Sequence, residues 1–236
     1  RFESRGLGDV YKRQTLDVVS RCDNISIFAL SAYRNSELLL SQCLQHEPKY
    51  AVLVDPEQHK YFKRLLAVSG CKTEFLDTED ALELIAAHEQ VDVVMAAIVG
   101  AAGLASGLAA VLAGKCLLLA NKESLIMSGK LFIEAAKQNN ADIIPIDSEH
   151  NAIFQCLAET RSGLSVTDGR FVDKLVLTAS GGPFLNTPKE ALAKVTPEQA
   201  CAHPKWSMGQ KISVDSATLM NNCLLYTSPS PRDSNL

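Results

Sequence analysis

The sequence predicts an α/β fold with a parallel sheet of the doubly wound type, for three reasons. Between residues 25 and 146, short apolar segments alternate with amphipathic segments of helical length. Parallel strands need a long crossover connection, and a helix of this length supplies it. Several apolar segments are followed directly by polar side chains, and the carboxyl ends of strands are where such sheets place their chemistry.

The expected strands and helices follow from this alternation. Strands are expected over residues 25–30, 50–54, 93–99, 116–120, 143–146 and 176–178. Helices are expected over residues 15–19, 36–44, 56–68, 81–87 and 124–138, with another that starts at Leu104. Pro56 opens one helix, where its missing N–H is not needed, and Gly114 ends the helix from Leu104.

Residues 93–114 must be tested as a membrane span, because they carry no charge and contain a G-x-x-x-G motif at 103–107. The run divides into a β-branched strand, a turn at 100–103 and a helix. That helix is expected to place four apolar side chains on one face: Leu104, Leu108, Val111 and Leu112. The segment is rich in Ala and Gly and has no flanking Trp or Tyr, so we do not interpret it as a membrane span.

The composition excludes several other classes of protein. The 236 residues suffice for one large domain or two small ones, and 47% of them are hydrophobic, as in ordinary globular chains. The net charge is −4 with scattered Lys and Arg, which argues against a nucleic-acid surface. The seven cysteines contain no C-x-x-C pair, which argues against a zinc ribbon or a disulfide scaffold. This pattern favours a reducing compartment, so we expect a cytoplasmic protein.

A cluster of polar residues follows the apolar segment 143–146: Asp147, Ser148, Glu149, His150 and Asn151. In an extended segment, the side chains of Asp147 and Glu149 point the same way and can converge on one point. Two hard oxygen ligands suit Mg²⁺ or Mn²⁺ better than zinc. The alternative is a helix N-terminus, with Asp147 or Ser148 as the cap and Glu149 in the first turn. Spacing alone leaves both interpretations open.

Four other motifs occur along the chain: Asn-Lys-Glu-Ser at 121–124, Leu-Thr-Ala-Ser-Gly-Gly-Pro-Phe at 177–184, His-Pro-Lys-Trp-Ser-Met-Gly at 203–209, and Lys-Ile-Ser-Val-Asp-Ser-Ala-Thr-Leu-Met-Asn at 211–221. Together with the segment 147–150, they resemble the 1-deoxy-D-xylulose 5-phosphate reductoisomerase family. No single motif is decisive, but five in this order are very specific. The resemblance runs from about Thr15 to Asn221.

The resemblance implies a domain organisation. A Rossmann-like NADPH-binding domain is expected over residues 15–140, followed by an incomplete α+β catalytic domain over 141–222. The family's C-terminal helical domain would be absent, and a homodimer is expected. Residues 1–14 lack a recognisable glycine-rich phosphate loop and resemble a non-native leader; the alternative is a divergent loop whose Lys and Arg contact phosphate. Residues 223–236 resemble a non-native, disordered tail that is rich in Pro and Ser.

Arg34 is a candidate for cofactor recognition. In a nucleotide-binding unit, the end of the second strand meets the adenosine ribose, and a basic residue there favours NADP because it can pair with the 2′-phosphate. The alternative is a solvated loop arginine. The resemblance implies cofactor contacts at six positions: Tyr33, Arg34, Asn35, Asn121, Glu123 and Gly209.

The resemblance also assigns the substrate and metal sites. The metal, Mg²⁺ or Mn²⁺ and possibly Co²⁺ in the family, would lie on Asp147 and Glu149, and Lys122, Glu149 and His203 would be catalytic. Substrate contacts are implied at Lys122, Ser148, Glu149, Ser180, His203, Trp206, Ser216 and Asn221. The residues themselves allow less specific interpretations: Lys122 as a surface charge, and Trp206 as a core anchor. Residues 183–209, rich in Pro, would be a lid of loops and short helices.

The implied reaction rearranges 1-deoxy-D-xylulose 5-phosphate to a branched aldehyde phosphate and reduces it with NADPH to 2-C-methyl-D-erythritol 4-phosphate, an isoprenoid precursor. The family continues after Asn221 with a phosphate-binding lysine and a third metal ligand, a glutamate, where this chain has Asn222 and Leu225. We therefore expect weak metal binding and little activity from the chain as written. Two alternatives remain: an NADP-dependent oxidoreductase of the semialdehyde or homoserine dehydrogenase type, and a catalytically inert nucleotide- or phosphate-binding fragment.

Overall fold

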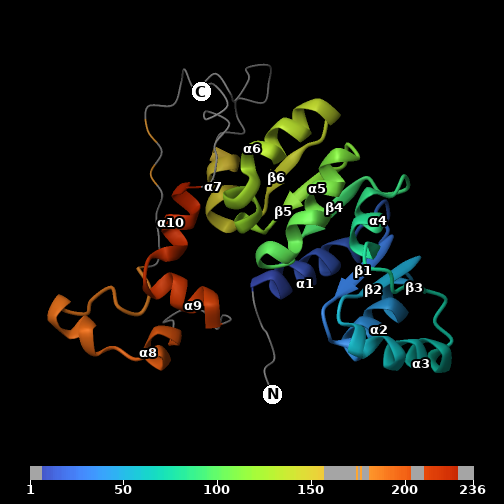
Figure 1. Ribbon diagram of the computed structural model, residues 1–236, viewed down its shortest axis with the longest axis horizontal. Helices are drawn as coiled ribbons and strands as arrows, with labels where there is room; N and C mark the ends of the chain where they lie inside the picture. The colour runs from blue at the N-terminus through green and yellow to red at the C-terminus, as the bar shows by residue number, and fades with distance from the viewer. Residues whose placement is uncertain (1–6, 157–173, 175, 177–180, 203–209, 228–236) are drawn as a thin grey trace.

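Two three-stranded parallel sheets with packed helices form the larger part of the molecule, and a group of short helices lies to one side (Figure 1). The structure is a computed structural model of the 236 residues, and it describes residues 7–156, 174, 176, 181–202 and 210–227. The parallel pairing confirms the predicted α/β class.

The first sheet has the strand order β1-β2-β3. Its strands are β1 (Ala29–Ala32), β2 (Tyr50–Leu53) and β3 (Glu74–Leu76). The helices of this part of the chain are α1 (Leu7–Val19), α2 (Ser36–His46), η1 (Pro56–Gln58) and α3 (His59–Ser69). Ala32 lies opposite Leu53 in the register, so the carboxyl ends of β1 and β2 meet at one edge.

The second sheet has the order β4-β5-β6 and carries the segments with the most polar motifs. Its strands are β4 (Val93–Ala96), β5 (Cys116–Leu119) and β6 (Ile143–Pro145). Its helices are α4 (Ala81–Ala87), η2 (Gly100–Gly103), α5 (Leu104–Leu112) and α6 (Lys122–Asn139), which is kinked at Ser128. Leu119 lies opposite Pro145, which aligns the carboxyl ends of β5 and β6.

The rest of the described chain is helical. It comprises α7 (Ser148–Cys156), η5 (Lys189–Lys194), α8 (Pro197–Cys201), α9 (Gln210–Ala217) and α10 (Met220–Thr227). Helix α8 packs on α9, α9 packs on α10, and α10 contacts α6. Helix α10 therefore connects this helical group to the second sheet (Figure 1).

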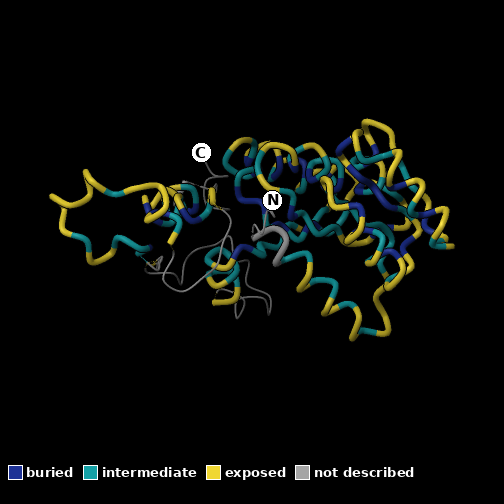
Figure 2. Tube along the Cα trace, turned by 90° about the horizontal axis from the view of Figure 1, so that it is seen from below, coloured by how far each residue is buried: buried dark blue, intermediate teal, exposed yellow. Residues whose placement is uncertain are grey.

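Each sheet has its own apolar core. Figure 2 shows the buried residues of the chain in dark blue. Under the first sheet, Phe62 and Leu66 lie one helical turn apart on α3 and face the strands. Under the second sheet, Phe132 of α6 is fully buried. A Cβ atom on Gly107 would lie 3.4 Å from the Phe132 ring, so the glycine lets α5 approach α6 closely.

Several expected boundaries differ from the structure. The first strand begins at Ala29 instead of residue 25, β3 was not predicted, and the helix expected over 56–68 is divided into η1 and α3. Of the four apolar side chains expected on one face of α5, Val111 is fully buried and Leu112 is 54% exposed. Val176 has no assigned structure, and the rest of the strand expected at 176–178 lies outside the described residues.

The two ends of the described chain are helical. Helix α1 begins at Leu7, within the segment interpreted as a leader, so the residues just before Thr15 form no phosphate loop. Helix α10 continues to Thr227, although disorder was expected from residue 223.

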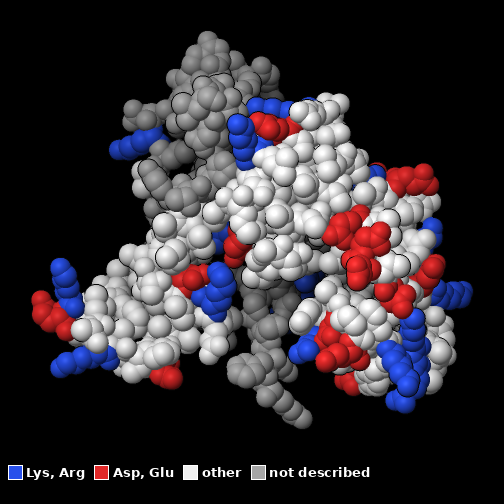
Figure 3. Space-filling model, viewed as in Figure 1, with Lys and Arg blue, Asp and Glu red and all other residues white. Residues whose placement is uncertain are grey.

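The structure bears on three properties expected from composition. The seven cysteines are free. Among the described residues, no helix combines the length and apolar character needed to cross a membrane. On the face shown in Figure 3, basic side chains stand singly or beside acidic ones and form no continuous basic field.

Replacing Phe132 with Ala should destabilise the protein by about 3–5 kcal/mol, because the ring is fully buried between α5 and α6 and would leave a cavity. Leu131→Ala is the matched control, since Leu131 is 49% exposed on the same helix. The control should change stability by less than about 0.5 kcal/mol. Urea denaturation measures both; equal losses would contradict this packing.

Candidate active site at the carboxyl ends of β5 and β6

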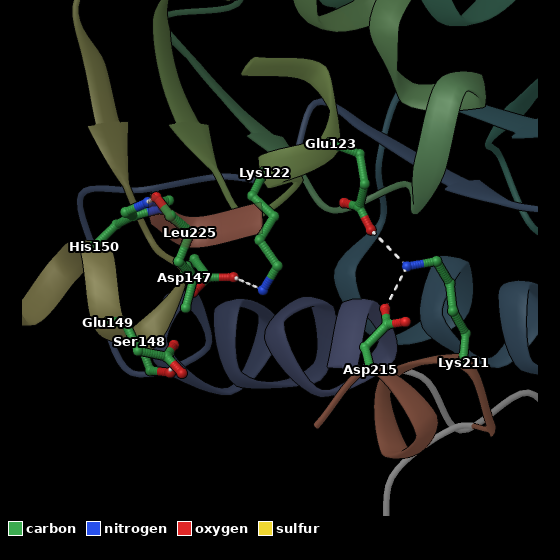
Figure 4. Close-up of polar contacts among 9 residues, drawn as sticks. All are labelled: Lys122, Glu123, Asp147, Ser148, Glu149, His150, Lys211, Asp215 and Leu225. Carbon is green, nitrogen blue, oxygen red and sulfur yellow. Dashed lines mark hydrogen bonds and ion pairs between the residues drawn. The ribbon is translucent and has the colours of Figure 1, made fainter. Parts of the chain in front are cut away.

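A buried ion pair joins the ends of two neighbouring strands. Lys122 follows β5 at the start of α6, and Asp147 follows β6. Lys122 Nζ lies 2.9 Å from Asp147 Oδ2, and the two side chains are only 5% and 7% exposed (Figure 4). Lys122 is therefore not the surface charge that the sequence alone allowed. The structure brings together two residues that were predicted to belong to one site.

Asp147 is only partly compensated by Lys122. Its Oδ1 atom is buried and has no hydrogen-bond partner. Burial raises the pKa of the Asp147 carboxyl, the Lys122 ammonium opposes that rise, and the nearby Glu149 adds to it. A buried carboxylate oxygen without a donor is unfavourable, so this atom is open to a proton or to a bound cation.

Glu149 lies beside Asp147 but on a different element from the one predicted. It is in the first turn of α7, so the expected extended geometry over 147–149 is wrong. Burial acts to raise the pKa of the Glu149 carboxyl, but its interactions with Asp147 and Ser148 lower that pKa overall. Ser148 Oγ donates to Glu149 Oε2 over 2.6 Å. The two carboxyl groups thus converge, although Glu149 occupies the helix N-terminus that the alternative interpretation gave it.

The start of α7 is fixed by Asn151. Its backbone N–H donates to the Asp147 carbonyl over 2.8 Å, and its Nδ2 donates to the Pro145 carbonyl over 2.7 Å. These bonds attach the first turn of α7 to the end of β6. The direction of the Asp147 side chain toward Lys122 is therefore set by backbone geometry as well as by charge.

The carboxylate oxygens at this site are the type of ligand that a hard divalent cation prefers, but they come from only two residues. Asp147 and Glu149 offer carboxylate oxygens, one of them buried and unpaired. Within the described part of the chain, no three His, Cys, Asp or Glu residues gather as a complete ligand set. Leu225 of α10 is 4% exposed and lies beside the site, with its carbonyl 3.3 Å from His150 Nε2 (Figure 4). Its apolar side chain cannot supply a further oxygen ligand to a cation bound by Asp147 and Glu149.

Tyr11 of α1 also reaches this site, and sequence reasoning missed it. Burial raises the pKa of the Tyr11 hydroxyl, the carboxylates of Asp147 and Glu149 raise it further, and hydrogen bonding to Ser148 opposes the rise. Tyr11 falls in the segment interpreted as a leader, and no motif in the sequence marks it. The contact depends on how α1 lies against α7, which local patterns do not specify.

Asn121 packs against the glycine turn η2. Its Nδ2 donates to the Gly100 carbonyl over 3.0 Å, while its Oδ1 is buried without a partner. A Cβ atom on Gly103 would lie 2.6 Å from the Ile98 carbonyl and 2.7 Å from Asn121 Nδ2. Only glycine fits at residue 103, so the turn and Asn121 form one unit at the ends of β4 and β5.

Glu123 connects α6 to α9 through Lys211. Lys211 Nζ lies 3.5 Å from Glu123 Oε1 and 2.6 Å from Asp215 Oδ2 (Figure 4). Burial opposes the charge of Lys211, but Asp215 and Glu123 outweigh it and raise its pKa. Lys211 and Asp215 belong to a recognised motif, but no role was predicted for either. Their contact holds α9, which carries Ser216, beside the first turn of α6.

The predicted phosphate-binding residues are only partly described. A Cβ atom on Gly182, whose φ is +65°, would lie 2.7 Å from the Ser216 carbonyl, so Gly182 packs directly on α9. Asn221 Oδ1, at the start of α10, is buried without a hydrogen-bond partner. Four predicted site residues lie outside the described residues: Ser180, His203, Trp206 and Gly209.

The other predicted cofactor residues lie on the first sheet, directly after β1. Asn35 Oδ1 accepts from the Leu38 N–H over 3.0 Å and so caps α2. Tyr33 is 64% exposed, and the Arg34 guanidinium lies 5.5 Å from the centre of its ring. Arg34 is also ion-paired with Asp55, at the end of β2. The cofactor predictions that the structure describes thus fall in two groups, one at the edge of each sheet.

Lys122→Met should destabilise the protein by about 3–5 kcal/mol at neutral pH, because it leaves the Asp147 carboxylate buried and unpaired. Asp147 has a raised pKa in the folded protein, and protonated Asp147 needs no ion pair, so the loss should be small in acid and should grow as pH rises through that raised pKa.

Lys130→Met is the control for that variant, since Lys130 is on the same helix and its side chain is 90% exposed. It should change stability by less than about 1 kcal/mol at any pH. Urea denaturation across pH measures both variants. A Lys122→Met deficit that does not depend on pH would contradict the assignment to Asp147.

Comparison with known proteins follows the same two parts of the chain. A family model described as 1-deoxy-D-xylulose 5-phosphate reductoisomerase matches residues 12–129, and a model of that enzyme's C-terminal domain matches residues 143–228. The reductoisomerase of Cellvibrio japonicus is 56% identical over 216 residues, which are 89% of this chain and 54% of that protein. The Pseudomonas putida KT2440 protein is 55% identical over 212 residues, 89% of this chain and 52% of its own length.

Solved structures of reductoisomerases also match this chain. DOX-P reductoisomerase in complex with NADPH, fosmidomycin and magnesium has a TM-score of 0.85 at 40% identity, over 98% of this chain and 56% of that one. The Zymomonas mobilis reductoisomerase in complex with NADPH has a TM-score of 0.79 at 42% identity, over 91% and 53% of the two chains. The chain thus spans about half the length of the relatives it matches. Two family models in order and relatives at this identity lead to one conclusion: the chain belongs to the 1-deoxy-D-xylulose 5-phosphate reductoisomerase family.

Proposed function

We propose that this chain carries the cofactor-binding part and the start of the catalytic part of an enzyme that converts 1-deoxy-D-xylulose 5-phosphate to 2-C-methyl-D-erythritol 4-phosphate with NADPH and a divalent metal. The observation that carries the proposal is the buried ion pair of Lys122 and Asp147 at the ends of β5 and β6, with the half-buried Glu149 beside it. We place the cofactor domain at residues 15–140 and the incomplete catalytic domain at 141–222.

Asp147 and Glu149 would hold the metal, Mg²⁺, Mn²⁺ or Co²⁺. The unpaired, buried Oδ1 atom of Asp147 supports this assignment. When bound, the metal would act as a Lewis acid on vicinal oxygens of the substrate. Lys122 remains beside Asp147 Oδ2, at 2.9 Å, and adds positive charge for a developing oxyanion.

The substrate would lie between the ends of β5 and β6 and helix α9. Ser148 and Glu149 would contact its hydroxyl end, and Ser180, Ser216 and Asn221 its phosphate. Two observations support this phosphate subsite: the close packing of Gly182 on Ser216, and the unpaired, buried Oδ1 of Asn221. His203, which would be catalytic, and Trp206 would lie on a lid over the substrate. A closed lid would exclude water from the site.

NADPH would supply the hydride. Asn121, Glu123 and Gly209 would contact it near the substrate, and Tyr33, Arg34 and Asn35 would contact its adenosine half. The hydrogen bond from Asn121 to the Gly100 carbonyl supports this assignment, because it joins Asn121 to the glycine turn η2 at the same edge of the sheet. We further propose that the complete enzyme is a cytoplasmic homodimer; the seven free cysteines support the reducing compartment.

Leu225→Glu should strengthen Mn²⁺ binding by about tenfold or more, because it adds a carboxylate beside Asp147 and Glu149. Met220→Glu is the control, since it adds the same charge to α10 at a side chain that is 48% exposed. Isothermal titration calorimetry with Mn²⁺ measures both. Equal affinity in the two variants and the unaltered chain would contradict a metal site at this place.

The reaction itself can be followed as the loss of NADPH absorbance with 1-deoxy-D-xylulose 5-phosphate and Mn²⁺. We expect little turnover from this chain and more from Leu225→Glu, with none from Leu225→Glu combined with Asp147→Asn. Metal-independent oxidation of NADPH with an aspartate semialdehyde would instead favour the dehydrogenase alternative. Thermal stabilisation by NADPH without oxidation in any variant would favour an inert binding fragment.

A further inference from the structure

Arg34 and Asp55 are brought together by the ends of β1 and β2. The Val54 N–H donates to the Ala32 carbonyl and the Asp55 N–H donates to the Tyr33 carbonyl, each over 3.0 Å. These two bonds continue the parallel pairing beyond the strands and fix the backbone on both sides. Arg34 Nε donates to Asp55 Oδ2, so one side of the guanidinium is held at the sheet edge.

Both oxygens of Asp55 act as acceptors. While Oδ2 takes the Arg34 Nε–H, Oδ1 accepts from the Glu57 backbone N–H over 3.0 Å and caps η1. The Asp55 side chain is 6% exposed, and the Arg34 guanidinium holds the pKa of its carboxyl below the ordinary value. An asparagine has one acceptor oxygen in place of two, so it could serve only one of the two donors.

Arg34 is held on one side and open on the other. Its side chain is 60% exposed, although its Nε is bound to Asp55 and its guanidinium lies 5.5 Å from the Tyr33 ring centre. The nearest charge on the open side is Glu57, whose Oε2 is 3.6 Å from Nη2 and whose side chain is 79% exposed. The terminal nitrogens are thus directed at solvent beside one easily displaced carboxylate.

We propose that Asp55 is a positioning residue that determines the preference for a 2′-phosphorylated adenosine cofactor, by holding Arg34 so that its terminal nitrogens meet the phosphate, and that Glu57 is the anion displaced. This inference rests on the proposed function, in which Arg34 meets the adenosine half of NADPH. A guanidinium that is already fixed loses less rotamer entropy when it binds phosphate than a free side chain does.

Charge and positioning predict opposite effects for Asp55. If its carboxylate only reduced the positive potential at Arg34, neutral substitutions at Asp55 and at Glu57 would both strengthen phosphate binding. If it positions Arg34, neutralising Asp55 weakens phosphate binding while neutralising Glu57 strengthens it. Asp55→Asn and Glu57→Gln therefore form a matched pair, because each removes one negative charge next to the same arginine.

The test is calorimetric titration of the full chain with adenosine 2′,5′-bisphosphate and with adenosine 5′-monophosphate, which differ only in the 2′-phosphate. The quantity compared is the ratio of the two affinities. We expect Arg34→Ala and Asp55→Asn each to reduce this ratio by about tenfold, and Glu57→Gln to raise it by up to about fivefold. Asp55→Ser should behave like Asp55→Asn. Because serine can still cap η1, this variant separates the loss of the Arg34 contact from a loss of stability.

The outcomes separate the two levels of the proposal. If the unaltered chain shows no preference for the 2′-phosphate, or if Arg34→Ala leaves the preference unchanged, the role of Arg34 in the proposed function fails and the inference fails with it. If Arg34→Ala removes the preference but Asp55→Asn and Asp55→Ser retain or increase it, Arg34 binds the phosphate and the positioning role of Asp55 is wrong.

Discussion

The buried pair of Lys122 and Asp147 is the interaction on which the site depends. Two charges taken out of water are stable only if each compensates the other, and here Asp147 Oδ1 is left without a donor. Apolar side chains at both strand ends would not carry this desolvation cost. In this chain Leu119 of β5 lies opposite Pro145 of β6, so the charged residues that follow the two strands lie close together. An uncompensated carboxylate oxygen at such a place favours a site that is completed by a ligand.

The first turn of α6 distributes three consecutive side chains to three parts of the chain. Asn121 bonds to the η2 turn, Lys122 to Asp147, and Glu123 to Lys211 of α9. Successive side chains around a helix start point in different directions, so this short segment can contact the η2 turn, the end of β6 and helix α9 at once. This explains how a short motif can serve both halves of the proposed reaction. It also connects α9 to the second sheet across 88 residues of sequence.

The sequence predicted those features that depend on period and order. Alternating strands and helices predicted the parallel sheets, and the family resemblance of the motifs after two strands implied that Lys122 and Asp147 belong to one site. Features that depend on tertiary packing were not predictable. The contact of Tyr11 with Ser148, the ion pair of Lys211 with Glu123 and the exposure of Leu112 are set by how helices pack against one another. The position of Glu149 was predicted only in part. Its side chain lies near Asp147 as expected, but it does so from the first turn of α7 and not from an extended segment.

The proposal that Asp147 and Glu149 bind a metal in the folded chain is tested most directly by X-ray diffraction from crystals grown with Mn²⁺. The anomalous difference map should show a peak in contact with oxygens of both carboxylates, near Lys122 and Leu225. The same peak should be missing in crystals of Asp147→Asn. A peak bound elsewhere, or one that persists unchanged in the variant, would contradict the claim.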